Sequence, residues 1–312
     1  MTTFRTNTAA AATGTKPGPR RLSFLEQVEN DRSPPPDRSI GNYIRDRRRL
    51  TDEQVEQIMV YQRKHGARFG DSAVALNLAT RGDVLWALSQ QFDYAYAGKS
   101  GSFDPELVVA IDPFGDQAEA FRDLRSQLLV GVMAPENPRT ALAVLSAQSG
   151  DGKTYVAANM AIALSQLGGR TLLIDADMRT PRQGKLFGVE GSSIGLSGVL
   201  SGRFGVDVIQ EVAELPSLYL LPVGTLPPNP LELVQHSRFS LLLNELHGKF
   251  DHIIVDTPAA SHGADSRVIA TKCGSALVLG RRNATAVKPM QALLHSLART
   301  PTQVAGVLLN EY

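Results

Sequence analysis

Short apolar runs, rich in leucine or β-branched residues, alternate with helical stretches after residue 116. Six of these runs are predicted strands: Ala141–Ser146, Thr171–Ile174, Leu218–Leu221, His252–Val255, Ala276–Leu279 and Val304–Leu309. Unbroken apolar strands separated by helices are typical of a parallel sheet that is covered on both faces. The pattern therefore predicts a doubly wound, mostly parallel α/β domain over residues 116–312, with its ligand site at the carboxyl ends of the strands.

Residues 39–97 carry a different pattern, an internal repeat with a constant offset. The repeated positions are Gly41 with Gly70, Thr51 with Thr80, and Gln62 with Gln91. A fixed period indicates a duplicated supersecondary unit. Each repeated threonine precedes a helical pattern, so both are predicted N-caps. We expect a small, mainly helical domain here.

Two segments have the composition of connectors. Residues 1–38 are rich in Thr, Ala, Gly and Pro, which predicts a disordered N-terminal segment. Residues 98–115 hold several glycine and proline breakers and are predicted to be a linker.

Composition then narrows the class of protein. The chain has 312 residues, of which 43% are apolar and 20% charged, so it can form a sizeable core. The net charge of +1 gives no electrostatic reason to expect nucleic acid as a partner. The single cysteine, Cys273, excludes an internal disulfide framework. No apolar run approaches the ~20 residues of a membrane span, so we expect a cytoplasmic protein.

A candidate phosphate-binding loop follows the first predicted strand. It reads Ser149-Gly150-Asp151-Gly152-Lys153-Thr154 and leads into a helix. Glycines let the backbone curl so that N–H groups converge on phosphate oxygens, and a helix N-terminus adds partial positive charge. Lys153 would neutralise the β- and γ-phosphates of ATP, and the Thr154 hydroxyl would bind Mg²⁺. Ala147 stands where the usual pattern has its first glycine.

Three carboxylates follow two of the predicted strands. Asp175 and Asp177 come after the second strand, and Asp256 follows a later one. Carboxylates beside a phosphate loop suit Mg²⁺ or its water shell, so Asp175 and Asp256 are candidate metal residues. Asp177 is a candidate to orient or deprotonate the acceptor hydroxyl. An aspartate at a strand end is also a common turn former.

In this order the motifs resemble those of the bacterial tyrosine kinases, which act with chain-length-determinant proteins in polysaccharide synthesis and export. Asp175-x-Asp177-x-Arg179 resembles the family's Walker A′ motif. Further matches are Leu221-Pro222-Val223-Gly224, Pro227-Pro228-Asn229-Pro230-x-Glu232-Leu233, Asp256-Thr257-Pro258, Asp265 and Gly306-Val307-Leu308-Leu309-Asn310. The resemblance implies an Mg-ATP-dependent autokinase of exopolysaccharide biosynthesis, held at the inner membrane by its partner. It also places Tyr155 and Asn310 at the nucleotide.

Three charged residues are candidates for a contact between copies of the chain. Glu119, Arg122 and Arg125 follow one flank of a predicted helix. The triplet is similar to the family's oligomerisation motif, which implies a homo-oligomer and, in relatives, a ring. A solvated charged flank is the alternative interpretation.

The sequence also departs from the family pattern. Relatives phosphorylate a tyrosine cluster on a C-terminal tail, whereas here Tyr312 is the single candidate phosphoacceptor. Two alternatives follow: a non-phosphorylating regulator, and an ATPase of the partitioning or cell-division-site type. Gln148 occupies the position of the second group's signature lysine.

The helical repeat resembles the N-terminal domain of type II secretion ATPases, some of which bind cyclic di-GMP. Arg68, ahead of a predicted helix, could meet a phosphate of that ligand. Ala73, Asn77 and Ala79 depart from the pattern. We favour protein docking as the role of this domain, with cyclic di-GMP binding as the alternative.

Overall fold

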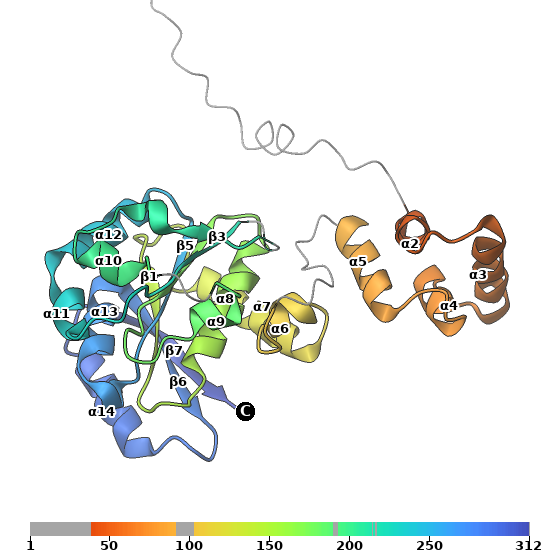
Figure 1. Cartoon of the computed structure of the whole chain (residues 1–312). Helices are drawn as coiled ribbons and strands as arrows, with labels where there is room; N and C mark the ends of the chain where they lie inside the picture. The colour runs from red at the N-terminus through yellow and green to blue at the C-terminus, as the bar shows by residue number, and fades with distance from the viewer. Residues whose placement is uncertain (1–38, 92–102, 190–192, 214, 216, 312) are drawn as a thin grey trace, which may run out of the picture.

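The computed structural model describes residues 39–91, 103–189, 193–213, 215 and 217–311. Residues 40–91 form a helical unit with a hydrophobic cluster of its own. Residues 103–311 form an α/β domain (Figure 1). The predicted disordered segment 1–38 lies outside the described residues. No helix in the described ranges is long and apolar enough to cross a membrane.

Two helix–turn–helix repeats make up the helical unit. The first holds α2 (Ile40–Arg48) and α3 (Asp52–His65), and the second holds α4 (Phe69–Ala75) and α5 (Arg81–Gln91). Thr51 caps α3 in a reciprocal capping box with Gln54. Thr80 does the same before α5, because its Oγ1 accepts from the Asp83 N–H while Asp83 Oδ2 accepts from the Thr80 N–H. Both predicted N-caps are therefore confirmed.

A buried charge cluster ties the first repeat to the second. Asp83, 5% exposed, accepts hydrogen bonds from the guanidinium groups of Arg47 and Arg48. Burial raises the pKa of Asp83, but hydrogen bonds from Thr80 and Arg48 outweigh it and lower the pKa to about 2. Arg47 also lies over the Trp86 ring, 4.4 Å from its centroid. These contacts fix α2 against α5.

The α/β domain is built on a sheet of seven strands in the order β3-β4-β2-β5-β1-β6-β7. Its strands are β1 (Ala141–Ser146), β2 (Thr171–Asp175), β3 (Gln210–Glu211), β4 (Leu218–Leu221), β5 (His252–Asp256), β6 (Gly274–Arg281) and β7 (Gln303–Asn310). Every pair is parallel except β3–β4. All six predicted strands and the mostly parallel sheet are confirmed. β3 was not predicted, because two residues are too short for a periodic pattern.

Helices cover both faces of the sheet (Figure 1). They are α6 (Val108–Ile111), α7 (Asp116–Val130), α8 (Lys153–Ser165), α9 (Gln183–Leu186), α10 (Leu196–Leu200), α11 (Pro230–Gln235), α12 (Ser237–His247), α13 (Asp265–Cys273) and α14 (Val287–Leu297), with 3₁₀ turns η1 (Val206–Val208) and η2 (Ala260–His262). Along β1, Leu142 and Val144 face the core under α7 and α8, while Ala143 and Leu145 face the core under α12 to α14. This alternation is the expected signature of a sheet buried on both sides.

The boundary of the α/β domain differs from the prediction. Residues 98–115 are predicted to be a linker, yet Leu107 and Val109 are fully buried in the core of this domain. The Val109 N–H donates to Asn159 Oδ1 on α8 at 3.0 Å, and Asn159 Nδ2 donates to the Glu106 carbonyl at 2.8 Å. Glycine and proline mark the turns that flank α6, but they carry no information about burial.

Candidate functional site

The loop between β1 and α8 is tightly curled. Gly150 and Gly152 have φ values of +85° and +98°, a left-handed conformation that favours glycine. Gly152 is also the N-cap residue of α8, so the loop delivers its N–H groups to the start of a helix. This is the geometry that the sequence predicts for a phosphate-binding loop.

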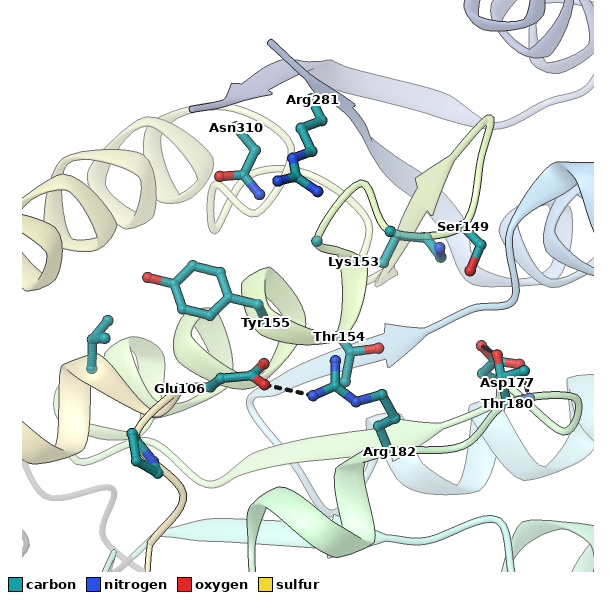
Figure 2. A pocket seen from close by; sticks show the side chains of 14 residues that line it. Glu106, Ser149, Lys153, Thr154, Tyr155, Asp177, Thr180, Arg182, Arg281 and Asn310 are labelled. Carbon is teal, nitrogen blue, oxygen red and sulfur yellow. Dashed lines mark hydrogen bonds and ion pairs between the residues drawn. The ribbon is translucent and has the colours of Figure 1, made fainter. Parts of the chain in front are cut away.

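A cavity of about 520 Å³ lies over this loop (Figure 2). Its lining includes the predicted residues Ser149, Gly150, Gly152, Lys153, Thr154, Tyr155, Asp177 and Asn310. It also includes six that were not predicted: Pro105, Glu106, Val108, Thr180, Arg182 and Arg281. Figure 2 shows Arg281 and Asn310 side by side at one end of the site, away from Asp177 and Thr180.

Lys153 is a buried cation at the base of the cavity, with 7% of its surface exposed. Its Nζ donates to Ser146 Oγ at 3.0 Å, and that hydroxyl donates to the Gln148 carbonyl at 2.6 Å. Burial lowers the pKa of Lys153, and the negative charges of Asp256, Asp177 and Asp151 oppose this shift. The lysine is therefore held among carboxylates at the place where phosphate charge would be neutralised.

Asp175 and Asp256 form a carboxylate pair below the cavity. They are direct partners across β2 and β5, and both are completely buried. Burial raises the pKa of Asp175 well above its usual value, and the charge of Asp256 raises it further. Burial also raises the pKa of Asp256 to about 6, although hydrogen bonds from Gln183 and Thr154 act against it. The raised pKa values show that burial outweighs the hydrogen bonds that both carboxylates accept and, at Asp256, the charge of Lys153.

Mg²⁺ fits this pair. Asp256 Oδ1 is buried and has no hydrogen-bond partner among the described residues, so it is open to a cation or to water on that cation. In the described part of the chain no group of three or more His, Cys, Asp or Glu side chains is placed to hold a metal by itself. Mg²⁺ at nucleotide sites is commonly held by one or two carboxylates together with substrate phosphates, and this donor set meets that requirement.

Asp177 is fixed in orientation at the cavity wall. Its Oδ1 accepts from the N–H groups of Arg179 and Thr180 at 3.1 and 2.9 Å, and its Oδ2 accepts from Thr180 Oγ1 at 2.9 Å. Arg179 in turn makes an ion pair with the buried Asp265 at 2.9 Å. The loop after β2 therefore presents one ordered carboxylate to the cavity.

The Asp151 side chain does not line the cavity. Its Oδ1 accepts from Thr285 Oγ1 at 2.6 Å, and its Oδ2 accepts from the Gln148 N–H at 3.1 Å. The Asp151 carbonyl accepts from Asn310 Nδ2 at 3.1 Å. In this geometry the Asp151 carboxylate braces the phosphate loop against the segment after β6, and the Asp151 carbonyl braces it against the end of β7.

Several residues of the site had no signal in the sequence. Arg182 forms an ion pair with Glu106 at 2.5 Å beside Thr154 (Figure 2). Gln183 is fully buried against Asp175 and Asp256. Arg281 ends β6, so the rule that ligand sites lie at carboxyl strand ends could have found it. Arg182 and Gln183 belong to the loop and short helix after β2. Their position in the sequence does not show that they contact Glu106 and Asp256, which are far away along the chain.

The charged triplet lies on α7, and its arginines bind within the chain. Arg122 Nε donates to Glu119 at 2.7 Å, and an Arg122 terminal nitrogen donates to the Pro113 carbonyl at 2.5 Å. Arg125 donates to the Ala163 carbonyl at 2.6 Å. The Glu119 side chain is 71% exposed. Tyr312, the candidate phosphoacceptor, lies outside the described residues.

Comparison with known proteins places the chain in a family. The family model described as the CobQ/CobB/MinD/ParA nucleotide binding domain matches residues 142–312. The putative tyrosine-protein kinase CapB of Staphylococcus aureus is 32% identical over 218 residues, which are 69% of this chain and 92% of CapB. The chain belongs to the bacterial tyrosine-kinase family. The tyrosine-protein kinase Wzc of Salmonella typhi is 31% identical over 205 residues, but the match spans only 28% of that relative's length.

Solved structures agree with this placement. The kinase domain of the Escherichia coli tyrosine kinase ETK matches with a TM-score of 0.62 and 30% identity, covering 67% of this chain and 80% of that one. The chimerical protein CapA2B2 matches with a TM-score of 0.62 and 27% identity, covering 72% of this chain and 97% of that one. The cell division ATPase MinD of Pyrococcus furiosus, at 24% identity and a TM-score of 0.50, shares the fold. The named relatives favour the kinases over the cell-division group.

Proposed function

We propose that the protein is an Mg-ATP-dependent tyrosine kinase of a capsule or exopolysaccharide system. The observation that carries the proposal is the placement of Lys153, Thr154 and Asp177 around one cavity, directly above the Asp175–Asp256 pair. Phosphoryl transfer needs mainly positioning and charge neutralisation, and these residues supply both. The named tyrosine kinases among the relatives support the same conclusion.

Each residue has a role in this proposal. The loop N–H groups and Lys153 hold the phosphates of ATP, while Thr154, Asp175 and Asp256 hold Mg²⁺, which would neutralise charge on the phosphates when bound. The tyrosine oxygen forms a bond to the γ-phosphorus, and the bond from that phosphorus to the bridging oxygen of ADP breaks. Asp177, fixed by Arg179 and Thr180, orients the hydroxyl and accepts its proton, which then passes to water.

The test is incubation of the full chain with Mg-ATP, followed by anti-phosphotyrosine detection and mass-spectrometric mapping. Lys153→Ala should lose the signal, whereas Lys249→Ala, at an exposed lysine just after α12, should keep it. Tyr312→Phe shows whether Tyr312 is the acceptor. No phosphotyrosine in wild type that still binds ATP would contradict the kinase and favour the non-phosphorylating regulator.

The partners of the kinase are part of the proposal. A membrane chain-length-determinant protein would hold the chain at the inner membrane, and exposed Glu119 would contact a second copy. Light scattering with Mg-ADP should then give a larger mass for wild type than for Glu119→Ala. Equal masses would contradict the interface at α7.

Protein docking is the role that we favour for the helical unit, and cyclic di-GMP is the alternative ligand. Arg68 is exposed and is the N-cap residue of α4, so its guanidinium is available to a phosphate. Binding of cyclic di-GMP would give saturable heat in calorimetric titration of the full chain, and Arg68→Ala would remove it. A titration without saturation in wild type would leave protein docking as the role of this unit.

A further inference from the structure

Gln183 is a neutral side chain that joins the buried carboxylate Asp256 to the phosphate loop. Its Nε2 donates to Asp256 Oδ2 at 2.8 Å and to the Thr154 carbonyl at 3.1 Å. Its backbone N–H donates to Asp175 Oδ2 at 3.1 Å. One completely buried residue therefore contacts three of the residues assigned to the metal.

The contacts fix the orientation of the Gln183 amide. Both partners of Nε2 are oxygen acceptors, a carboxylate and a backbone carbonyl, so the reversed amide would place Oε1 against two acceptors. Oε1 must then point away from both of them.

Gln183 Oε1 is itself a buried acceptor without a partner among the described residues, and so is Asp256 Oδ1. A buried acceptor without a hydrogen-bond donor destabilises the fold, so such groups in a native protein usually accept from a ligand, water or ion. Both oxygens belong to one hydrogen-bonded pair of side chains, and both lack a donor. A water molecule held by a cation supplies donors of the required kind.

We propose that Gln183 is a positioning residue for Mg²⁺: its amide nitrogen sets the direction of Asp256, and its amide oxygen accepts from water bound to the ion. The proposal rests on the proposed nucleotide site, and it gives Gln183 no direct contact with the reacting atoms. Residues that orient metal ligands commonly change metal affinity by about 10–100-fold when they are replaced.

The experiment measures the affinity of the full chain for a fluorescent ADP analogue in excess EDTA and across a Mg²⁺ titration. Gln183→Met keeps the size of the side chain but removes donor and acceptor. This variant should raise by about 10–100-fold the Mg²⁺ concentration that produces half of the full gain in affinity for the ADP analogue. The affinity measured in EDTA should stay at the wild-type value. Gln166→Met is the matched control, because the Gln166 amide donates to the Val109 carbonyl, away from the cavity.

Gln183→Asn is the second variant. It replaces Gln183→Met in the experiment if the methionine variant shows no cooperative unfolding and is therefore not properly folded. The shorter side chain cannot span from Asp256 to the Thr154 carbonyl, so the same shift in Mg²⁺ response is expected. An unchanged Mg²⁺ midpoint in a folded variant would overturn the inference. An equal loss of affinity with and without Mg²⁺ would also overturn it, since that result indicates a structural role. Wild type that binds no nucleotide would overturn the proposed function as well.

Discussion

Asp175 and Asp256 face each other across β2 and β5, and both side chains are completely buried. Parallel pairing places both residues at the carboxyl edge of the sheet, where the cavity opens above them. The raised pKa values of both carboxyls have burial as their largest cause. The nucleotide-free domain therefore contains an electrostatic cost that a bound cation would remove.

Asp256→Asn should stabilise the nucleotide-free protein at pH 7.5 by on the order of 1–3 kcal/mol, because it removes one of two buried like charges. The same change should abolish phosphotransfer. Urea unfolding of wild type and variant measures the difference, with exposed Asp207→Asn as the control. A destabilised Asp256→Asn variant would show that the ionised carboxylate contributes favourably to the fold.

The stability of the nucleotide-free protein should fall as the pH rises from 4 to 6. Asp256 has an ordinary pKa of 3.8 and a folded value of about 6, so the folded state binds more protons in this window. The contribution is fully present below the unfolded pKa and is lost as the pH passes the folded value. Mg²⁺ competes with those protons, so the gain in nucleotide affinity from Mg²⁺ should be smaller at pH 6 than at pH 8. A gain that does not change with pH would contradict the raised pKa of Asp256.

Arg179→Ala should destabilise the domain by about 2–4 kcal/mol, since it leaves the carboxylate of Asp265, 2% exposed, without its partner. Lys249→Ala removes a pair with Glu245 whose side chains are 44% and 50% exposed, and should cost less than about 1 kcal/mol. Urea unfolding compares the two. Arg179→Met combined with Asp265→Leu should recover part of the loss, because no buried charge then remains unpaired. If Arg179→Ala and Lys249→Ala lowered the free energy of unfolding equally, the buried Asp265 would not depend on Arg179 as a partner.

Gly152→Ala should weaken nucleotide binding more than Gly150→Ala. Both glycines have left-handed φ values, so each alanine adds about 1–2 kcal/mol of strain. At Gly152 the added Cβ would also clash with Asn310 Nδ2, whereas at Gly150 nothing lies within 4 Å. Titration with an ADP analogue measures the difference. Because the clash needs Asn310, Gly152→Ala with Asn310→Ala should lose less than the sum of the single effects. Strictly additive losses would exclude the clash.

Sequence patterns were sufficient for six of the seven strands and for some of the charged groups of the site. The strands are unbroken apolar runs, and Lys153, Asp175 and Asp256 follow strands whose ends meet at one edge. Burial of Leu107, Val109 and Ala110 could not be predicted, because breaker residues describe the local backbone and not what packs against it. Gln183 could not be predicted either, since its partner Asp256 lies on another strand and a glutamine in a short helix has no distinctive pattern.

The brace between Asn310 and the phosphate loop has a consequence for the order in which the protein is made. The two hydrogen-bonded residues are 159 positions apart, and β7 pairs with β6 at the edge of the sheet. A growing chain that has reached β6 already holds every residue assigned to phosphate and metal, but not the side chain that supports the loop. Domains are completed from the N-terminus during synthesis, so a nascent chain should acquire firm nucleotide binding only when β7 leaves the ribosome and joins the sheet.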